Sequence, residues 1–241
     1  MDYIFKIFRF DPLKDEAPYF QEFLYSAEEE KSILEALMDI RNEQDSTLAF
    51  RYSCREAICG ACGMVVNGTF GLICRTAVEA LGSSRIILEP LPNLEIQKDL
   101  VVNMDPFWEA LSKIEPYLFS EGEILEKGHR IEEKEVEKIF QFVNCIMCGC
   151  CYSTCPVVSR DQRYLGPAAL AKLFRFVNDP RDKRSFSSWA RVNSEGGVWG
   201  CDKISQCNDV CPKLVRPADG IGALRRTLIV ENIKRLFKFK R

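Results

Sequence analysis

Apolar and polar positions at the start of the chain predict a β-strand over residues 3–10, where aromatic and β-branched residues recur at short intervals. Residues 26–29, Ser-Ala-Glu-Glu, have the form of a capping box, which predicts the start of a helix. The apolar positions that follow repeat at helical spacing. They predict one buried face made of Ile33, Leu34, Leu37 and Ile40.

Further strands are expected beyond a cysteine-rich loop. The stretch MVV-NG-TFGLI predicts a β-hairpin that turns at Asn67 and Gly68, a pair that suits a type I′ turn. Another strand is expected near residues 86–88, and Val101 and Val102 can form a last short edge. Strands around one helix predict a small α+β domain over residues 1–103.

The second half reads as all-α, from residue 104 to residue 241. Helical patterns cover residues 105–119 and 132–144, and two further helices begin at Pro167 and Pro217. Proline suits these two places because the first turn of a helix does not need its missing N–H. The predicted fold class is therefore α+β, with a mixed first domain and a helical second domain.

Composition narrows the function classes. The chain has 241 residues, which favours two domains, and 33 basic against 35 acidic residues give a net charge of -2. That balance favours no nucleic-acid partner. The chain has no run of about 18 consecutive apolar residues, so no membrane-spanning helix is expected. The start of the chain lacks the pattern of a signal peptide, so we expect a cytoplasmic location.

Twelve cysteines accompany a single histidine, His129. The cysteines are clustered, which favours a role as ligands over scattered thiols. Disulfides have little support in a reducing compartment. His129 lies in a polar stretch, EKGHRIEEK, and we expect it to be exposed to solvent.

The first cysteine group has the spacing C-x4-C-x2-C, with a fourth cysteine eleven residues later. This is the plant-type [2Fe–2S] pattern. Gly60 and Gly63 allow a tight loop, and the hairpin brings the fourth cysteine back beside the third. A zinc site is the alternative, but zinc favours two short C-x2-C pairs. The predicted [2Fe–2S] ligands are Cys54, Cys59, Cys62 and Cys74.

The second group reads C-x2-C-x2-C-x3-C-P, from Cys145 to Pro156. This is the bacterial ferredoxin run, whose fourth cysteine ligates the other cluster. A third group ends in Cys211-Pro212. Because ligands are shared crosswise between two such runs, the predicted [4Fe–4S] ligands are Cys145, Cys148, Cys151 and Cys211.

The remaining set contains only Cys155, Cys201 and Cys207, because Ile204 stands where the ferredoxin pattern has a cysteine. Isoleucine cannot bind iron, so a cubane here lacks one ligand and is expected to be [3Fe–4S]. The three sites use eleven of the twelve cysteines. Cys150 is left over as a small buried thiol, although it could replace Cys151 as a ligand.

Together these features resemble the iron–sulfur subunits of succinate dehydrogenase and fumarate reductase. The resemblance spans nearly the whole chain and is most specific in SCREAICGACGM, LEPLPNLEIQKDLVVNMDPF, LGPAALAKLFRF and the cysteine runs. It implies a β-grasp plant-type ferredoxin domain followed by a bacterial-ferredoxin-like helical domain. It also implies a flavoprotein partner with covalent FAD and a membrane anchor, a cytochrome b subunit that handles quinone, often with haem b. Dicarboxylate chemistry would belong to the flavoprotein, and this chain would carry electrons, with no catalytic residue of its own.

In that family the quinone lies near the [3Fe–4S] region, so the resemblance makes Pro156, Ile204 and Arg225 the quinone-binding candidates. Relatives that use ubiquinone carry a tryptophan after Cys-Pro and a histidine in the last run, and this chain has neither. The departures favour menaquinone. The basic tail, RRTLIVENIKRLFKFKR, suits an anionic membrane surface, which predicts a peripheral protein on the cytoplasmic face. Its expected apolar positions are Leu228, Ile229, Ile233, Leu236 and Phe237.

Two other functions remain open. One is the electron-transfer subunit of a related thiol-dependent or heterodisulfide-type reductase, although such relatives tend to carry extra CCG-type motifs downstream, and this chain has none there. The other is a zinc-stabilised interaction module without a redox role. Metal content separates the zinc module from the redox functions, because three clusters of the expected types hold about nine irons per chain.

Overall fold

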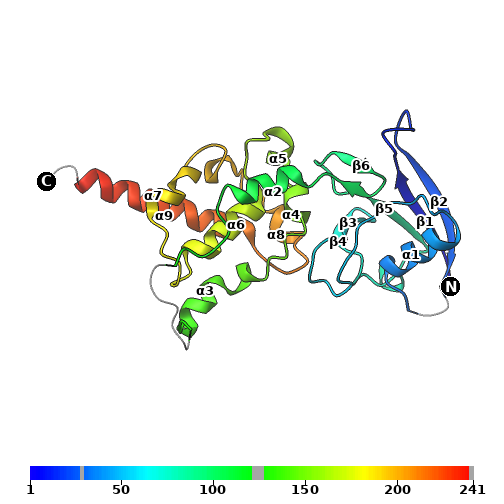
Figure 1. Ribbon diagram of the computed structural model, residues 1–241, viewed down its shortest axis with the longest axis horizontal. Coiled ribbons are helices and arrows are strands. Elements are labelled where there is room, and N and C mark those ends of the chain that lie inside the picture. The colour runs from blue at the N-terminus through cyan, green and yellow to red at the C-terminus, as the bar shows by residue number, and fades with distance from the viewer. Residues whose placement is uncertain (28–29, 121–127, 239–241) are drawn as a thin grey trace. The chain divides into compact units, whose positions relative to one another are not determined.

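The computed structural model describes residues 1–27, 30–120 and 128–238, with side chains placed to residue 234. The chain forms two compact units (Figure 1). The first contains residues 1–104 together with two short segments from later in the chain, 146–154 and 210–212. The second contains residues 105–145, 155–209 and 213–241.

The first unit is built on a five-stranded mixed sheet with the order β2-β1-β5-β3-β4. The two central strands β1 and β5 run parallel, and the other neighbours are antiparallel. A separate antiparallel pair, β6 with β7, lies outside this sheet. The strands are β1 (Asp2–Arg9), β2 (Tyr19–Ser26), β3 (Gly63–Val66), β4 (Thr69–Leu72), β5 (Arg85–Glu89), β6 (Ile96–Lys98) and β7 (Val101–Val102).

The core of this unit lies between the sheet and helix α1 (Ile33–Glu43), and the short 3-10 helix η1 (Glu79–Leu81) precedes β5. Alternation along β1 turns Phe5 and Ile7 inward, where both are fully buried. The predicted apolar face of α1 is confirmed, since all four of its residues are buried.

Helix α1 begins later than the sequence pattern predicted. The real capping box is formed by Ser32 and Glu35, in which the Ser32 amide donates to the Glu35 carboxylate at 2.8 Å. The predicted box at residues 26–29 is wrong as a helix start, because Ser26 ends β2 and pairs with Asp2 of β1. Residues 28–29 of that box lie outside the described part of the chain.

The predicted hairpin is confirmed. Strands β3 and β4 pair with Val66 opposite Thr69, so the turn consists of Asn67 and Gly68. Both have positive φ, 48° and 76°, as a type I′ turn requires.

A buried arginine braces the start of the first cysteine loop. Arg9 donates from Nε to Asp99 at 3.1 Å and from Nη1 to Asp45 at 2.6 Å. The Asp99 carboxylate also accepts the backbone amides of Phe10 and Ala49, at 3.0 and 2.9 Å. This network ties the end of β1 to the segment that leads into the loop, and its donors balance the buried carboxylate.

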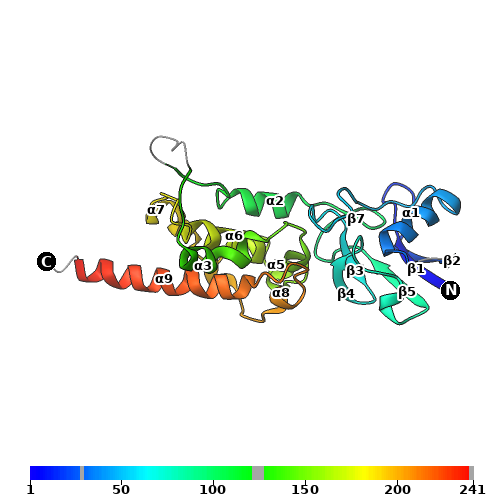
Figure 2. The same ribbon diagram turned by 90° about the horizontal axis from the view of Figure 1, so that it is seen from below.

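The second unit is helical around α6 (Gly166–Val177), which packs against α2 (Asp105–Ser112), α3 (Glu133–Val143) and α9 (Pro217–Lys238) (Figure 2). Gly220 of α9 allows close packing, because a Cβ there would lie 2.8 Å from the Phe142 ring. The short elements are α5 (Pro156–Arg160), α7 (Phe186–Trp189), η2 (Ala190–Val192), η3 (Val198–Gly200) and α8 (Gln206–Asp209). Helix α4 (Cys150–Ser153) belongs to the first unit.

The helix predicted over residues 105–119 is too long. Helix α2 ends at Ser112, and Glu115 adopts a positive φ of 50° before Pro116. Proline has no N–H and disfavours helical geometry in the residue before it, so the helix stops early. The Arg184 guanidinium then holds the segment, donating to the Tyr117 carbonyl at 2.7 Å.

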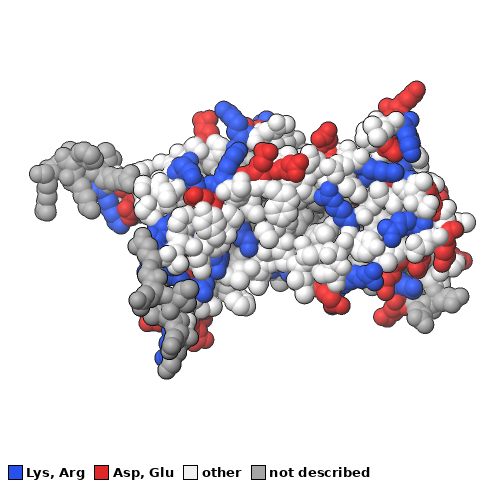
Figure 3. All heavy atoms as spheres, in the orientation of Figure 1, with Lys and Arg blue, Asp and Glu red and all other residues white. Residues whose placement is uncertain are grey.

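Charge is mixed over the surface. On the face shown in Figure 3, basic and acidic side chains are interspersed over both units, as the near-neutral net charge of -2 leads one to expect. Among the described residues, no helix has the length and apolar content needed to cross a bilayer.

Candidate metal centres

The first cysteine loop wraps its amides around a thiol. Positive φ values at Arg55, Ala57 and Gly60 (59°, 53° and 74°) wind the backbone into a concave turn. The Cys54 sulfur accepts the amides of Glu56, Ile58 and Cys59 at 3.4, 3.3 and 3.2 Å. These donors lower the pKa of Cys54 to about 6. A thiolate stabilised in this way fits an iron ligand.

The hairpin places the other two cysteines of this group side by side. Gly63 pairs with Leu72, and the Ile73 amide donates to the Cys62 carbonyl at 3.3 Å. Cys62 and Cys74 are both buried. Burial raises the pKa of Cys62, with Cys74 and Cys59 as its thiol neighbours. The structure thus brings together the four cysteines predicted for [2Fe–2S], and their ligand role remains a prediction.

The second cysteine group is divided between the two units. Cys148, Cys151 and Cys211 belong to the first unit, together with Cys150. Cys148, Cys151 and Cys211 are the electrostatic neighbours of Cys150, so these four thiols are close together. Cys145 is assigned to the second unit, and its place in the [4Fe–4S] set remains a prediction.

Helix α4 and the glycine before it shape this second group. Gly149 has φ 83°, and a Cβ there would lie 2.9 Å from Cε of Met104. The Asn93 side chain donates to the carbonyl of Ser153 at 2.6 Å, which fixes the end of α4. Residues 149–153 are therefore held by packing at their start and by a side-chain hydrogen bond at their end.

The surplus thiol, Cys150, is fully buried in a small apolar cluster with Leu91 and Val102. Its pKa is raised by the hydrogen bond with Cys148 and by burial. Cys151 is only partly buried. These surroundings suit a packed thiol at position 150 and leave the choice of Cys151 as the ligand in place as a prediction.

The first two cysteine loops pack backbone against backbone within the first unit. A Cβ added at Gly60 would lie 2.8 Å from the Ile146 carbonyl oxygen and 2.9 Å from Cα of Cys148. At Gly63, an added Cβ would lie 3.1 Å from the Cys148 carbonyl oxygen and 3.4 Å from the Cys150 sulfur. Glycine at both positions allows this approach.

The third cysteine group, defined from here on as the three predicted [3Fe–4S] ligands, lies wholly in the second unit. Cys155, Cys201 and Cys207 line one pocket. Burial raises the pKa of Cys207 to about 12 and also raises that of Cys155. The Cys201 sulfur accepts the amide of Lys203 at 3.4 Å, a donor that suits an iron-bound thiolate. Three convergent thiols with an amide donor fit a cluster with three protein ligands.

Two of the three candidate quinone residues line the same pocket. Pro156 opens α5 and lines the pocket, and Ile204 lines it with 53% of its surface exposed. Lys203 and Ser205 flank Ile204 with φ values of 60° and 67°, so the loop turns sharply where a fourth cysteine would stand.

Arg225, the third candidate, is held by backbone carbonyls. Its guanidinium donates to Val198 at 2.7 Å, Trp199 at 3.2 Å and Cys201 at 2.6 Å. Its guanidinium also lies over the Trp199 ring, 5.4 Å from the centroid. Whether or not quinone is bound, Arg225 anchors the segment that carries Cys201.

Sequence reasoning missed Tyr164, which also lines the third pocket. It is 1% exposed, and its hydroxyl is the one buried side-chain polar atom in the described residues without a hydrogen-bond partner. No spacing pattern marks it, because a single tyrosine between a polar loop and the apolar start of α6 looks like any core aromatic residue. His129 is exposed, as predicted. Among the described residues, no three His, Cys, Asp or Glu side chains form a group suited to a single metal ion.

Two families match this chain, one over each half of the sequence. Residues 4–109 match a 2Fe-2S iron-sulfur cluster binding domain. Residues 141–215 match a 4Fe-4S dicluster domain. Domains for both cluster types are therefore present, in the predicted order.

Relatives and a solved structure extend the match to nine tenths of the chain or more. The fumarate reductase iron-sulfur subunit of Escherichia coli O6:H1 is 38% identical over 219 residues, covering 90% of this chain and 88% of that protein. The succinate dehydrogenase iron-sulfur subunit of Coxiella burnetii is 35% identical, covering 94% and 97%. A chain of the Mycobacterium smegmatis Sdh1 complex in the apo form shares the fold, with a TM-score of 0.84, 21% identity and coverage of 95% and 96%. By these relationships, the chain belongs to the family of iron–sulfur electron-transfer subunits of succinate dehydrogenase and fumarate reductase, which are oxidoreductase complexes.

Proposed function

We propose that this subunit carries single electrons between the FAD of a flavoprotein partner and a quinone at a membrane anchor, through [2Fe–2S], [4Fe–4S] and [3Fe–4S] clusters. The sheet order with α1 packed on it supports a β-grasp plant-type ferredoxin domain in the first unit. The cysteine runs support a bacterial-ferredoxin-like second domain. Clusters of these types change redox state one electron at a time, with potentials set by hydrogen bonds, burial and charge.

One observation carries this proposal. Cys155, Cys201 and Cys207 line a single pocket that Ile204 also lines, and Ile204 stands where the ferredoxin pattern has a cysteine. A site with three thiolates and one apolar corner suits [3Fe–4S] and not a four-coordinate zinc. The same site argues against a zinc-stabilised interaction module.

The chain's own residues tune and protect the sites. Amides of the first loop donate to Cys54, and the Lys203 amide donates to Cys201. Both contacts favour the thiolate form that iron requires. Burial of Cys62 and Cys207 excludes water from one side of their sites.

Close packing of the first two cysteine loops supports a continuous path for electrons. Gly60 and Gly63 leave no side chain between the loop of the first group and the backbone around Cys148. The dicarboxylate chemistry is assigned to the flavoprotein, because the chain's one histidine, His129, lies exposed in a polar stretch. An electron-transfer subunit of a thiol- or heterodisulfide-type reductase would pass electrons through the same series of clusters, and this function remains the second candidate.

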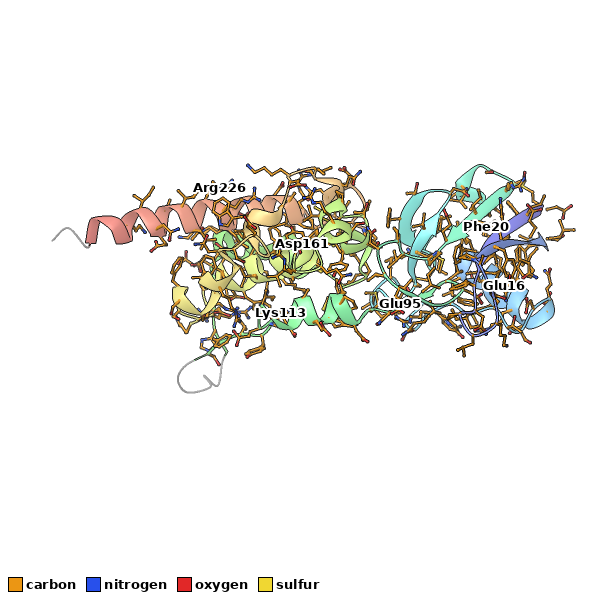
Figure 4. The ribbon with its side chains drawn as sticks, turned by 90° about the horizontal axis from the view of Figure 1, so that it is seen from above. Glu16, Phe20, Glu95, Lys113, Asp161 and Arg226 are labelled. Atoms are coloured by element: carbon orange, nitrogen blue, oxygen red, sulfur yellow. The ribbon has the colours of Figure 1, made fainter. Side chains whose placement is uncertain are left out.

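The membrane end is proposed to lie near α9. Ile229, Val230 and Ile233 are each about half exposed, at 46%, 49% and 47%. Arg226, marked on this helix in Figure 4, and Lys234 supply positive charge. Apolar side chains beside basic ones suit an anchor subunit, cytochrome b with or without haem b, and an anionic bilayer surface on the cytoplasmic side.

One residue of the expected apolar face points elsewhere. Leu228 is fully buried, so it packs inside the unit, and Val230 takes an exposed position that the pattern had not included. Leu236 and Phe237 lie outside the residues with described side chains.

Menaquinone is the proposed quinone. The two positions after Cys155-Pro156 hold buried valines, Val157 and Val158, and not a tryptophan. The loop from Cys201 to Cys211 contains no histidine. Reduction assays of the purified complex with menaquinone and ubiquinone analogues test this, and faster turnover with the ubiquinone analogue would refute it.

Electron paramagnetic resonance of the purified complex tests the cluster assignment. We expect a near-isotropic signal from the oxidised sample that vanishes on reduction, with about nine irons per chain. The variant Ile204→Cys supplies a fourth thiolate, so it should remove that signal and raise the iron content to about ten. Zinc without iron, or a silent oxidised wild-type sample, would refute the proposal.

A further inference from the structure

The Tyr164 hydroxyl is buried beside the third cysteine group and has no hydrogen-bond partner among the described residues. Burying a hydroxyl without a partner destabilises a protein, and native structures rarely leave such a group unsatisfied. The hydroxyl therefore points to an acceptor in the pocket that it faces.

Backbone contacts on both sides fix the position of the ring. The Tyr164 amide donates to the carbonyl of Asp161 at 3.1 Å, and the Leu165 amide donates to that of Gly196 at 2.8 Å. Figure 4 marks Asp161 in the loop that precedes α6. Across the pocket, Cδ2 of the ring lies 2.9 Å from the place of a Cβ on Gly200. Glycine at position 200 thus lets the ring pack against the backbone next to Cys201.

The sulfur atoms of the pocket are the groups that the hydroxyl faces. Tyr164 lines the pocket together with Cys155, Cys201 and Cys207. A phenol keeps its proton at neutral pH and acts as a donor. Cys201 already accepts one amide, from Lys203, and a thiolate sulfur can accept more than one hydrogen bond.

We propose that Tyr164 donates a hydrogen bond to the Cys201 thiolate when the three cysteines hold their cluster, and that it raises the reduction potential of that centre. Reduction adds negative charge to the cluster and its ligating sulfurs, so a donor stabilises the reduced form more than the oxidised form. The inference rests on the proposed function, because it requires a cluster at this site.

Redox titration of Tyr164→Phe, in the purified complex, tests the proposal. The variant removes one oxygen and keeps the ring, so the oxidised signal and the iron content should match those of the wild type. The ratio of reduced to oxidised centre at a given potential should fall about tenfold, which is about 59 mV for a one-electron couple. Tyr117→Phe removes the same atom from an exposed ring of the same unit and should leave the potential unchanged.

A second variant covers the case in which phenylalanine fails to assemble the site. Incorporation of 3-fluorotyrosine at position 164 keeps the ring size and makes the hydroxyl a stronger donor, so the potential should rise. The wild-type oxidised signal should also show a coupled proton that exchanges in D2O and is absent from Tyr164→Phe.

The outcomes distinguish the two proposals. A wild-type sample without the oxidised signal overturns the cluster assignment. A wild-type signal together with unchanged potentials in both Tyr164 variants overturns the role of the tyrosine alone. Opposite shifts in the two variants support it, because loss of packing would not reverse sign with donor strength.

Discussion

Replacement of Gly60 by alanine should separate the two cysteine loops that pack together in the first unit. Gly60 has φ 74°, a region that residues with a Cβ rarely adopt. An alanine Cβ would lie 2.8 Å from the Ile146 carbonyl oxygen and 2.9 Å from Cα of Cys148. Both neighbours are backbone atoms, so neither can rotate away, and one of the loops must shift.

The expected cost has two parts. The left-handed conformation costs an alanine about 1–2 kcal/mol. Overpacking against a rigid neighbour adds roughly 1–3 kcal/mol. Gly68→Ala is a matched control, because Gly68 has φ 76° but no atom within 4 Å of the added Cβ. The difference between the variants therefore isolates the packing of residue 60 against residues 146–148.

Thermal unfolding of the cluster-loaded protein, followed by bleaching of its visible absorption at one scan rate, measures this difference. About 1–3 kcal/mol at about 2–4 °C per kcal/mol gives a transition that is several degrees lower for Gly60→Ala than for Gly68→Ala. Iron and acid-labile sulfide should also fall in Gly60→Ala, because the shifted loop carries Cys148. Equal transitions and equal iron content in the two variants would show that the loops do not pack in this way.

Three further predictions concern single contacts. Asn93→Ala removes the hydrogen bond to the end of α4 and places alanine at φ 61°, so the free energy of unfolding of the cluster-loaded protein should fall by about 2–4 kcal/mol. Asn93→Gly should recover the part of this loss that comes from the backbone conformation. In iron-free protein, alkylation of Cys54 should be rapid at pH 7 and slow as the pH falls through about 6, because its pKa is lowered and the thiolate is lost on acidification. Cys150, whose pKa is raised, should stay unmodified in the same mass-spectrometric assay, and equal labelling of the two would contradict the amide cradle. Arg225→Ala should lower the occupancy of the third cluster, measured by the oxidised resonance signal, since three carbonyls lose their donor. The exposed neighbour Arg226→Ala should leave that signal unchanged, and an intact signal in both would limit Arg225 to another role.

Local pattern was enough for much of the first unit. The strand at residues 3–10, the hairpin at Asn67-Gly68 and the buried face of α1 depend on side-chain period and turn chemistry, which act between near neighbours. The start of α1 was misplaced because two segments had capping-box spacing. Only the pairing of Ser26 with Asp2 in the sheet excludes the earlier one.

Cysteine spacing was enough to indicate the family of this chain and to predict how its thiols group, because iron–sulfur ligation restricts which residues can share a cluster. Only the tertiary structure decided that residues 146–154 join the first unit, that glycines at positions 60 and 63 let its loops touch, and that Arg225 is engaged by carbonyls. No feature of the sequence marks Tyr164, since much of its environment is made by Gly200, Cys201 and Cys207, which are distant in the chain. Spacing along a chain reports local geometry and ligand chemistry. Contacts between distant segments depend on how whole surfaces pack, and that information exists only once the chain has folded.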